Sequence, residues 1–132
     1  MITNVKPDTQ KAKSLTKMAD ITLERLGATD TEKYPTNTLN DYYDIIHKLM
    51  EALAIFKGIK TKGEGAHQEL IDCISKEYSF DEHTRIFLQQ MRDFRNRIYY
   101  EGFTIHKNYI SLNKEKIMKI IRKLMGLAEK EQ

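Results

Sequence analysis

The feature that most constrains this chain is a long apolar pattern over residues 39–56. Apolar side chains recur there at steps of three and four, which places them on one side of an α-helix. The side chains that share this face are Tyr42, Ile45, Ile46, Leu49, Ala52, Leu53 and Phe56. The pattern therefore predicts a helix over 39–56 with one broad apolar face.

Four more helices are predicted from periodicity and from the residues that begin or end helices. The first covers residues 8–26 and stops at Gly27, and a polar connection follows it. A glycine-containing loop over 58–65 precedes a short helix over 67–78. The last helix is expected over 114–129, after a segment beyond Gly102 that lacks helical periodicity.

The remaining helix is expected to start at Ser79. Ser79 and Glu82 have the spacing of a capping box, in which each side chain accepts a hydrogen bond from a backbone N–H at the helix start. Apolar side chains then recur at steps of four, three and four, which predicts a packing seam. The seam consists of Phe87, Met91, Phe94 and Ile98.

Length and composition indicate one helical domain. A chain of 132 residues can bury one core but not two ordinary ones, and 2 Pro and 6 Gly suit a helix-rich protein. Few stretches look like β-strands and the connections are short. We therefore expect a single domain over 1–132 that is all-α, an antiparallel up-and-down bundle of four main helices plus one short helix.

Other bulk features bear on location and partners. The single cysteine, Cys73, cannot form an internal disulfide, no apolar run reaches membrane-spanning length, and the N-terminus lacks the apolar centre of a signal peptide. We therefore expect a cytoplasmic protein that does not enter a membrane. A formal net charge of +3 permits contact with nucleic acid without requiring it.

Metal and cofactor sites are not expected. The four histidines stand too far apart in the sequence for a local zinc motif, and only one cysteine is present. These histidines are His47, His67, His83 and His106.

The segment MRDFRNRIYYEGF, residues 91–103, gathers arginines and tyrosines on the helix that carries the seam. At 100° per residue, Arg92, Arg95 and Tyr99 fall on one line turned away from the seam, and Asn96 and Tyr100 fall on a neighbouring line. Planar guanidinium groups suit phosphate recognition. Arg92, Arg95, Asn96 and Tyr99 are therefore candidate contacts to phosphate or RNA.

The same segment allows a plainer interpretation. It can be a solvated basic face with ion pairs to Asp93 and Glu101, in which Arg97 is a structural ion-pair residue and Tyr99 is half-buried packing. The basic residues of the last helix also allow two interpretations, a solvated outer face or the border of an RNA path. These residues are Lys114, Lys116, Lys119, Arg122 and Lys123.

The stretch FRNRIYYEGFTI resembles the C-terminal signature of the HEPN superfamily (higher eukaryotes and prokaryotes nucleotide-binding domains). In that signature an Arg, commonly followed by Asn, precedes a His by a short spacer, and Arg95-Asn96-Arg97 matches its start. Residues 42–71 are similar to the early helix of such domains, followed by a glycine loop and a His that opens the next helix. The likeness covers roughly residues 39–105, about half of the chain.

The resemblance implies a helical homodimer in which the Arg motif of each subunit faces a shared cleft. In many members this cleft is a metal-independent ribonuclease, often the toxin half of a pair with a small nucleotidyltransferase. Carried over to this chain, Arg95 is the cation that stabilises the phosphate, and Asn96 orients the phosphate or a side chain of the partner subunit.

This chain departs from the signature at the aligned histidine, which is Tyr100 here. A phenol has a pKa near 10 and is a poor base at neutral pH, although it can stack on a base or donate to a phosphate. His67 is the candidate substitute base, with a hydrogen bond at the helix start as its alternative role. Where some members carry a tyrosine two residues further on, this chain has Gly102.

Three functions follow as hypotheses. The first is a module that binds RNA or nucleotide, as the partner of a nucleotidyltransferase, without strong catalysis. The second is a metal-independent ribonuclease that uses Arg95 with Tyr100 or His67. The third is a structural or interaction bundle whose arginines hold a dimer or another protein.

Overall fold

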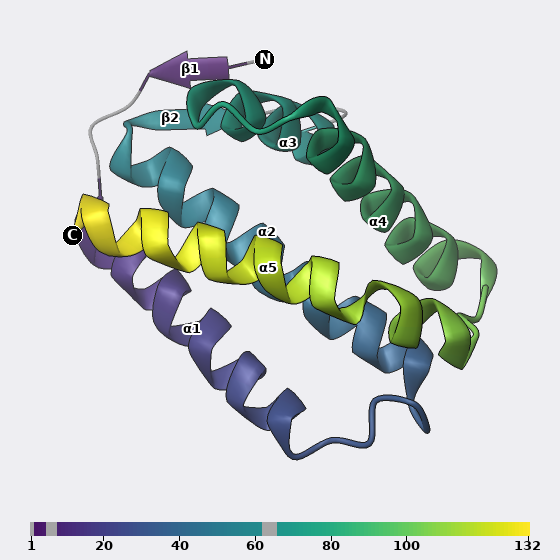
Figure 1. Cartoon of the computed structure of the whole chain (residues 1–132). Coiled ribbons are helices and arrows are strands. Elements are labelled where there is room, and N and C mark those ends of the chain that lie inside the picture. Colours follow the sequence, from purple (N-terminus) through teal and green to yellow (C-terminus); the bar gives the residue numbers. More distant parts are fainter. Residues whose placement is uncertain (1, 5–7, 62–65) are drawn as a thin grey trace.

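The computed structural model describes residues 2–4, 8–61 and 66–132, and it describes side chains over 8–59 and 69–132. Five helices and a two-stranded antiparallel ribbon make up the fold (Figure 1). The helices are α1 (Thr9–Gly27), α2 (Pro35–Phe56), α3 (Ala66–Glu77), α4 (Glu82–Glu101) and α5 (Lys107–Glu131). The strands β1 (Ile2–Asn4) and β2 (Ile59–Thr61) pair in antiparallel register.

Helix α2 is the central element, because it packs against each of the other four helices. In Figure 1, α1 and α2 run antiparallel to one another, α3 and α4 form a second antiparallel pair, and α5 returns along α2. The expected all-α up-and-down bundle of four long helices and one short helix is therefore confirmed. The small ribbon of β1 and β2 is an addition that the helical periodicity did not predict.

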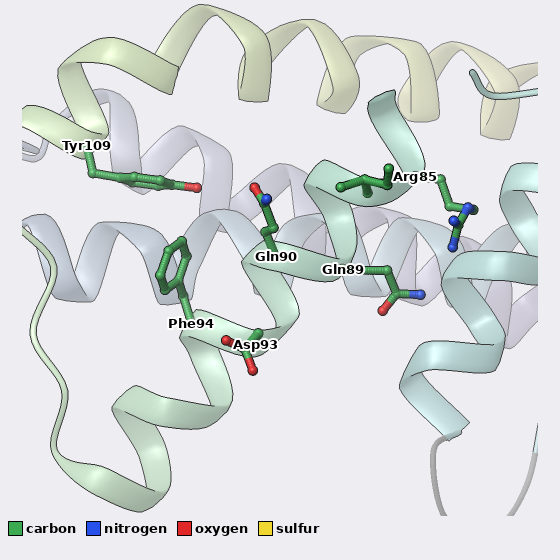
Figure 2. A pocket seen from close by; sticks show the side chains of 7 residues that line it. Arg85, Gln89, Gln90, Asp93, Phe94 and Tyr109 are labelled. Atoms are coloured by element: carbon green, nitrogen blue, oxygen red, sulfur yellow. The ribbon is translucent and has the colours of Figure 1, made fainter. Parts of the chain in front are cut away.

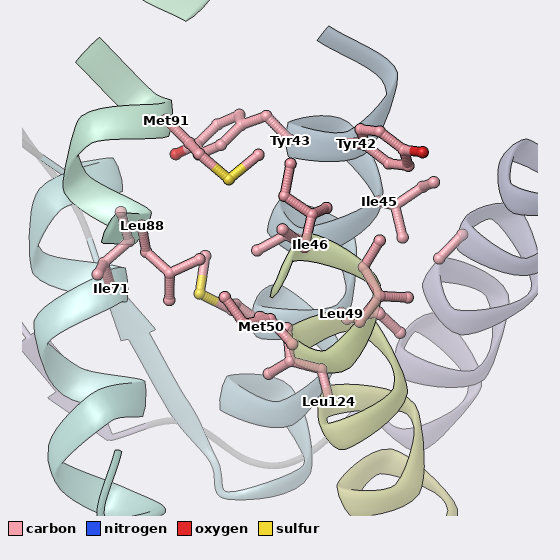
Figure 3. Close-up of a cluster of buried hydrophobic side chains, with 14 of the residues drawn as sticks. Tyr42, Tyr43, Ile45, Ile46, Leu49, Met50, Ile71, Leu88, Met91 and Leu124 are labelled. Atoms are coloured by element: carbon pink, nitrogen blue, oxygen red, sulfur yellow. The ribbon is translucent and has the colours of Figure 1, made fainter. Parts of the chain in front are cut away.

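The core forms where the broad face of α2 meets α3, α4 and α5. Figure 3 shows Ile46, Leu49 and Met50 of α2 beside Leu88 of α4 and Leu124 of α5. All five are fully buried. Burying such a side chain stabilises the fold by about 1.5–3 kcal/mol, so α2 and its neighbours hold the bundle together.

Helix α2 begins four residues before the expected residue 39. Pro35 occupies its first turn, where the missing N–H costs no hydrogen bond. The hydroxyl of Thr38 is buried and donates to the backbone oxygen of Tyr34 at 2.7 Å. The residues that start this helix are polar, so the apolar pattern did not reveal them.

The predicted capping box at Ser79 is wrong. Ser79 has φ of 55°, a left-handed conformation, and lies between α3 and α4. Helix α4 is capped by Asp81, whose Oδ1 accepts from the backbone N–H of Thr84 at 2.7 Å. Asp is as good a cap as Ser, and its carboxylate also favours the positive end of the helix dipole.

Helix α5 begins at Lys107, seven residues before the expected residue 114. His106 caps it, with Nδ1 accepting from the backbone N–H of Asn108 at 3.1 Å. Ile110 is buried but Leu112 is 83% exposed. This exposed leucine interrupts the spacing of apolar residues from which a helix is predicted. The segment after Gly102 is therefore mostly helix.

The connection between α4 and α5 is short and anchored. Gly102 ends α4 with φ of 67°, a left-handed value that glycine adopts without steric cost. Further along, the backbone N–H of Ile105 donates to Oγ1 of Thr36 at 2.9 Å, which ties the connection to the start of α2. The end of α4 is thus held in place.

In the ranges that the structure describes, no helix has the length and apolar character needed to cross a bilayer.

Candidate functional site

Helix α4 changes character along its length. Its fully buried residues, Phe87, Leu88 and Met91, all lie in the first half. In the second half the apolar residues Phe94 and Ile98 are only partly buried, and Tyr99 and Tyr100 are 74% and 79% exposed. The candidate site residues therefore lie where α4 emerges from the core.

Arg92 and Arg95 are the central candidates, and both are partly buried. Nε of Arg92 donates to Oε1 of Gln89 at 3.1 Å, and the guanidinium of Arg95 lies 5.9 Å from the centre of the Tyr99 ring. Within the part of the chain that the structure describes, neither arginine forms an ion pair with a carboxylate. Their positive charges are therefore not neutralised by those residues.

The other two arginines of α4 are held by carboxylates. Arg85 pairs with Glu82 and, through Nη1, with Asp72 Oδ1 at 3.0 Å. Arg97 lies 3.7 Å from Glu101 and 4.1 Å from the centre of the Phe103 ring. The ion pair with Glu101 that the plainer interpretation expected is thus present at Arg97.

Tyr43 of α2 was not expected at this site. Its ring is 1% exposed, and Figure 3 shows its hydroxyl pointing toward α4 beside Met91. Among the described residues this buried hydroxyl has no hydrogen-bond partner. Arg95 stands one turn beyond Met91 and is partly buried, so it borders the packing seam and is not turned away from it as the sequence predicted.

The electrostatics agree with this placement. Burial raises the pKa of Tyr43 to about 12, and the charges of Arg92 and Arg95 act against that increase. The Tyr43 phenol is therefore protonated at neutral pH and can donate a hydrogen bond. Two guanidiniums and one hydroxyl give an arrangement of donors, which suits an anion with several oxygen atoms.

The two exposed tyrosines have different positions relative to Arg95. Tyr99 lies one turn after Arg95 on the same side of the helix, and its exposure contradicts the expectation of half-buried packing. Tyr100 is about 140° around the helix axis from Arg95. Within one chain, the side chains of Tyr100 and Arg95 therefore do not point toward the same place. The two tyrosine rings contact each other edge to face, with centroids 5.1 Å apart.

The remaining candidates are less informative. Asn96 is partly buried, next to Arg95 in the sequence. His67 lies in the first turn of α3, but its side chain is outside the described residues, so its role as substitute base stays a prediction. His47 lies one turn after Tyr43 on α2, with Nδ1 2.8 Å from Glu51 and its ring centre 6.0 Å from that of Tyr43.

A depression of about 560 Å³ lies between α4 and α5, on a different side of α4 (Figure 2). Its lining consists of Arg85, Ile86, Gln89, Gln90, Asp93, Phe94 and Tyr109. Arg85 is engaged by carboxylates, and Asp93 would repel an anion. The depression meets the line of Arg92 and Arg95 only at Gln89, the hydrogen-bond partner of Arg92, and neither arginine lines it.

A metal centre has no support in the described ranges. No three His, Cys, Asp or Glu side chains gather there in a way that could hold a metal ion.

Comparisons with known proteins do not add to this picture. No family model matches the chain, and neither curated proteins nor solved structures provide a match.

Sequence reasoning found the arginines of α4 but missed Tyr43. The motif in residues 91–103 stands out because guanidiniums and phenols cluster in consecutive turns. Tyr43 resembles an ordinary core residue in the sequence, next to Tyr42 on the apolar helix. Only the packing of α2 against α4 shows that its hydroxyl has no partner.

Proposed function

We propose that the chain binds RNA through its phosphate groups, at the Arg92 and Arg95 face of α4. The observation that carries the proposal is that these two arginines lack carboxylate partners among the described residues, whereas Arg85 and Arg97 have them. An unneutralised guanidinium gains most from a phosphate, with which it forms paired hydrogen bonds.

The exposed tyrosines support RNA over an isolated phosphate ion. Tyr99 and Tyr100 present aromatic surface next to the arginines. Single-stranded RNA is held by this combination of cations for the backbone and aromatic rings for the bases. Asn96 supplies an amide between the two kinds of contact.

The resemblance to HEPN domains extends the proposal to the assembly. It implies a homodimer that brings two Arg95 motifs to one cleft, and a small nucleotidyltransferase as protein partner. A dimer would also bring Tyr100 of one subunit toward the motif of the other, which a single chain does not do. Light scattering of the purified protein tests the dimer, and co-purification with a nucleotidyltransferase tests the partner.

The first test is binding of a labelled single-stranded RNA, measured by fluorescence anisotropy at several salt concentrations. We expect Arg95→Ala to weaken binding about tenfold and to make the salt dependence shallower by roughly 0.7 in log–log slope, the effect of one lost phosphate contact. Arg85→Ala is the matched control, because it removes the same charge from the same helix at an arginine held by carboxylates. Equal losses in the two variants would contradict the proposal.

The ribonuclease alternative has its own test, cleavage of mixed RNA in EDTA by wild type, Arg95→Ala and Tyr100→His. Cleavage by wild type that Arg95→Ala abolishes would make the protein a ribonuclease and not only a binding module. If only Tyr100→His cuts, the fold has the geometry of a ribonuclease but lacks its imidazole. If none of the three proteins cleaves RNA, binding without cleavage remains the proposed function under those conditions.

An interaction bundle, the third hypothesis, predicts no salt-sensitive RNA binding by wild type. In that case Arg95→Ala would change the oligomeric state or the capture of a protein partner instead.

A further inference from the structure

The Tyr43 hydroxyl is one of four buried side-chain polar atoms that have no hydrogen-bond partner in the described part of the chain. Buried polar atoms are almost always hydrogen-bonded, because leaving one unpaired costs about 1–3 kcal/mol. Tyr43 is 1% exposed, and its oxygen has no partner among the described residues. Such a donor fits a site whose acceptor arrives with a ligand.

The position of the hydroxyl limits the ligand. It points from α2 toward α4 beside Met91 (Figure 3), and Arg95 stands one turn beyond Met91 on α4. An internal phosphodiester carries a nucleoside on two of its oxygens, so it cannot enter far between two helices. A phosphate at a chain end has three oxygens without a nucleoside and can reach further.

Charge favours the same ligand. A terminal phosphate monoester carries about 1.5 to 2 negative charges near neutral pH, whereas each internal phosphate carries one. Two guanidiniums without carboxylate partners in the described residues match the doubly charged group. The protonated phenol adds a neutral donor and no further charge.

Arg92 and Arg95 are less constrained than Arg85. Arg92 donates one hydrogen bond to Gln89 and Arg95 lies over the Tyr99 ring, whereas Arg85 is held by two carboxylates, Glu82 and Asp72.

We propose that the site recognises a terminal phosphate monoester of an RNA chain, with Arg92 and Arg95 binding its charged oxygens and the Tyr43 hydroxyl donating to one of them. The inference rests on the proposed RNA binding and adds its substrate class. Tyr43 is then a specificity-determining residue, because it acts only on RNA with a phosphorylated end.

The test uses three RNAs of one sequence with an internal fluorescent label: one with a 5′-phosphate, one with a 3′-phosphate and one with hydroxyls at both ends. We expect wild type to bind one of the phosphorylated RNAs about tenfold more tightly than the hydroxyl RNA, as suits a charged hydrogen-bonded contact. The arm that binds tightly identifies the end. No preference for either phosphorylated RNA would overturn the proposal.

Tyr43→Phe removes the hydroxyl and keeps the ring. We expect it to reduce the preference for the phosphorylated RNA to about threefold or less, while the melting temperature is unchanged or higher. A preference that survives Tyr43→Phe would overturn the role of this residue.

Tyr109→Phe is the matched control, because the Tyr109 hydroxyl is also buried and without a partner in the described part of the chain, but it borders the depression between α4 and α5. It should keep the full preference, and an equal loss in both variants would contradict a specific contact. If hydroxyl RNA binds and depends on Arg95, RNA binding stands even where the terminal-phosphate inference fails. Absence of binding to all three RNAs would contradict both the proposed RNA binding and the recognition of a terminal phosphate.

Discussion

The two halves of α4 belong to one helix and share one apolar seam, yet Arg85 in the first half and Arg92 and Arg95 in the second have opposite environments, while Arg97 in the second half is paired with Glu101. In the first half, Arg85 is engaged by Glu82 of its own helix and by Asp72 of α3. In the second half, Arg92 and Arg95 have no carboxylate partner among the described residues and stand beside the buried hydroxyl of Tyr43. The first arrangement stabilises a fold, and the second is suited to receive an anion.

An arginine-rich helix does not by itself present free guanidinium groups. The second half carries three arginines and two tyrosines, whereas the first half carries one arginine and no tyrosine. Arg85 and Arg97 have carboxylate partners, whereas Arg92 and Arg95 have none among the described residues. Each of the following experiments alters one half and leaves the other as the reference.

The largest effect is expected from Leu88→Ala, in the first half. Leu88 is 0% exposed in the core, so the substitution should lower the free energy of unfolding by about 2–5 kcal/mol through lost burial and a cavity. Urea denaturation measures the change. Tyr100→Ala in the exposed second half should alter stability by less than about 0.5 kcal/mol, and similar losses in the two variants would contradict the contrast between the halves.

A second experiment gives the second half a carboxylate of its own. In Asn96→Glu the new carboxylate stands one turn after Arg92, the spacing of a helical ion pair. It should neutralise Arg92 and repel phosphate, which lowers RNA affinity roughly tenfold or more at low salt.

Asn96→Gln is the control for this variant, since it lengthens the side chain without adding charge. Because its charge is the same as that of wild type, its affinity for RNA should stay within about twofold of the wild-type value. Unaltered RNA binding by Asn96→Glu would show that Arg92 does not contact phosphate.

The smallest effect concerns the cap of the first half. The backbone N–H of Thr84 donates to the Asp81 carboxylate and holds its pKa below the ordinary value of 3.8. The folded state thus favours the charged form, so the stability from this group is present above pH 3.8 and is lost as the pH falls through the lowered pKa.

Asp81→Ala should therefore melt at a lower temperature than wild type at neutral pH, and the difference in melting temperature should become smaller in acid. Thermal unfolding followed by circular dichroism across this range measures it. RNA binding should be unchanged, because the cap lies at the opposite end of α4 from Arg95. A difference in melting temperature that is independent of pH would show that the charge of Asp81 does not contribute to stability.

Much of the architecture was predictable because helices record their packing in the period of their apolar residues. The broad apolar face over residues 39–56 predicted helix α2, though not its central position, and the bundle of four long helices and one short helix followed from the spacing of the other segments. The errors occurred at helix starts. The cap of α4 is Asp81 and not Ser79, and α5 starts at Lys107 and not at residue 114. At both places, polar residues or an exposed leucine leave no helical spacing of apolar residues in the sequence.

The candidate site divides in the same way. Arg92, Arg95, Asn96 and Tyr99 could be named from the sequence because they are neighbours on one helix. Tyr43 could not, since it reaches the site from a helix some fifty residues away, and no local pattern distinguishes an unpaired buried hydroxyl from a paired one.

By itself, the sequence determined five amphipathic helices and a cluster of arginines and tyrosines on the fourth, because both are local properties of residue order. Only the tertiary structure decided that Asp72 of α3 engages Arg85 and that the Tyr43 hydroxyl of α2 is buried against α4 without a partner among the described residues. The reason is physical: carboxylates and hydroxyls from other helices act over a few ångströms in space, and that proximity is created by the packing of α2, α3 and α4.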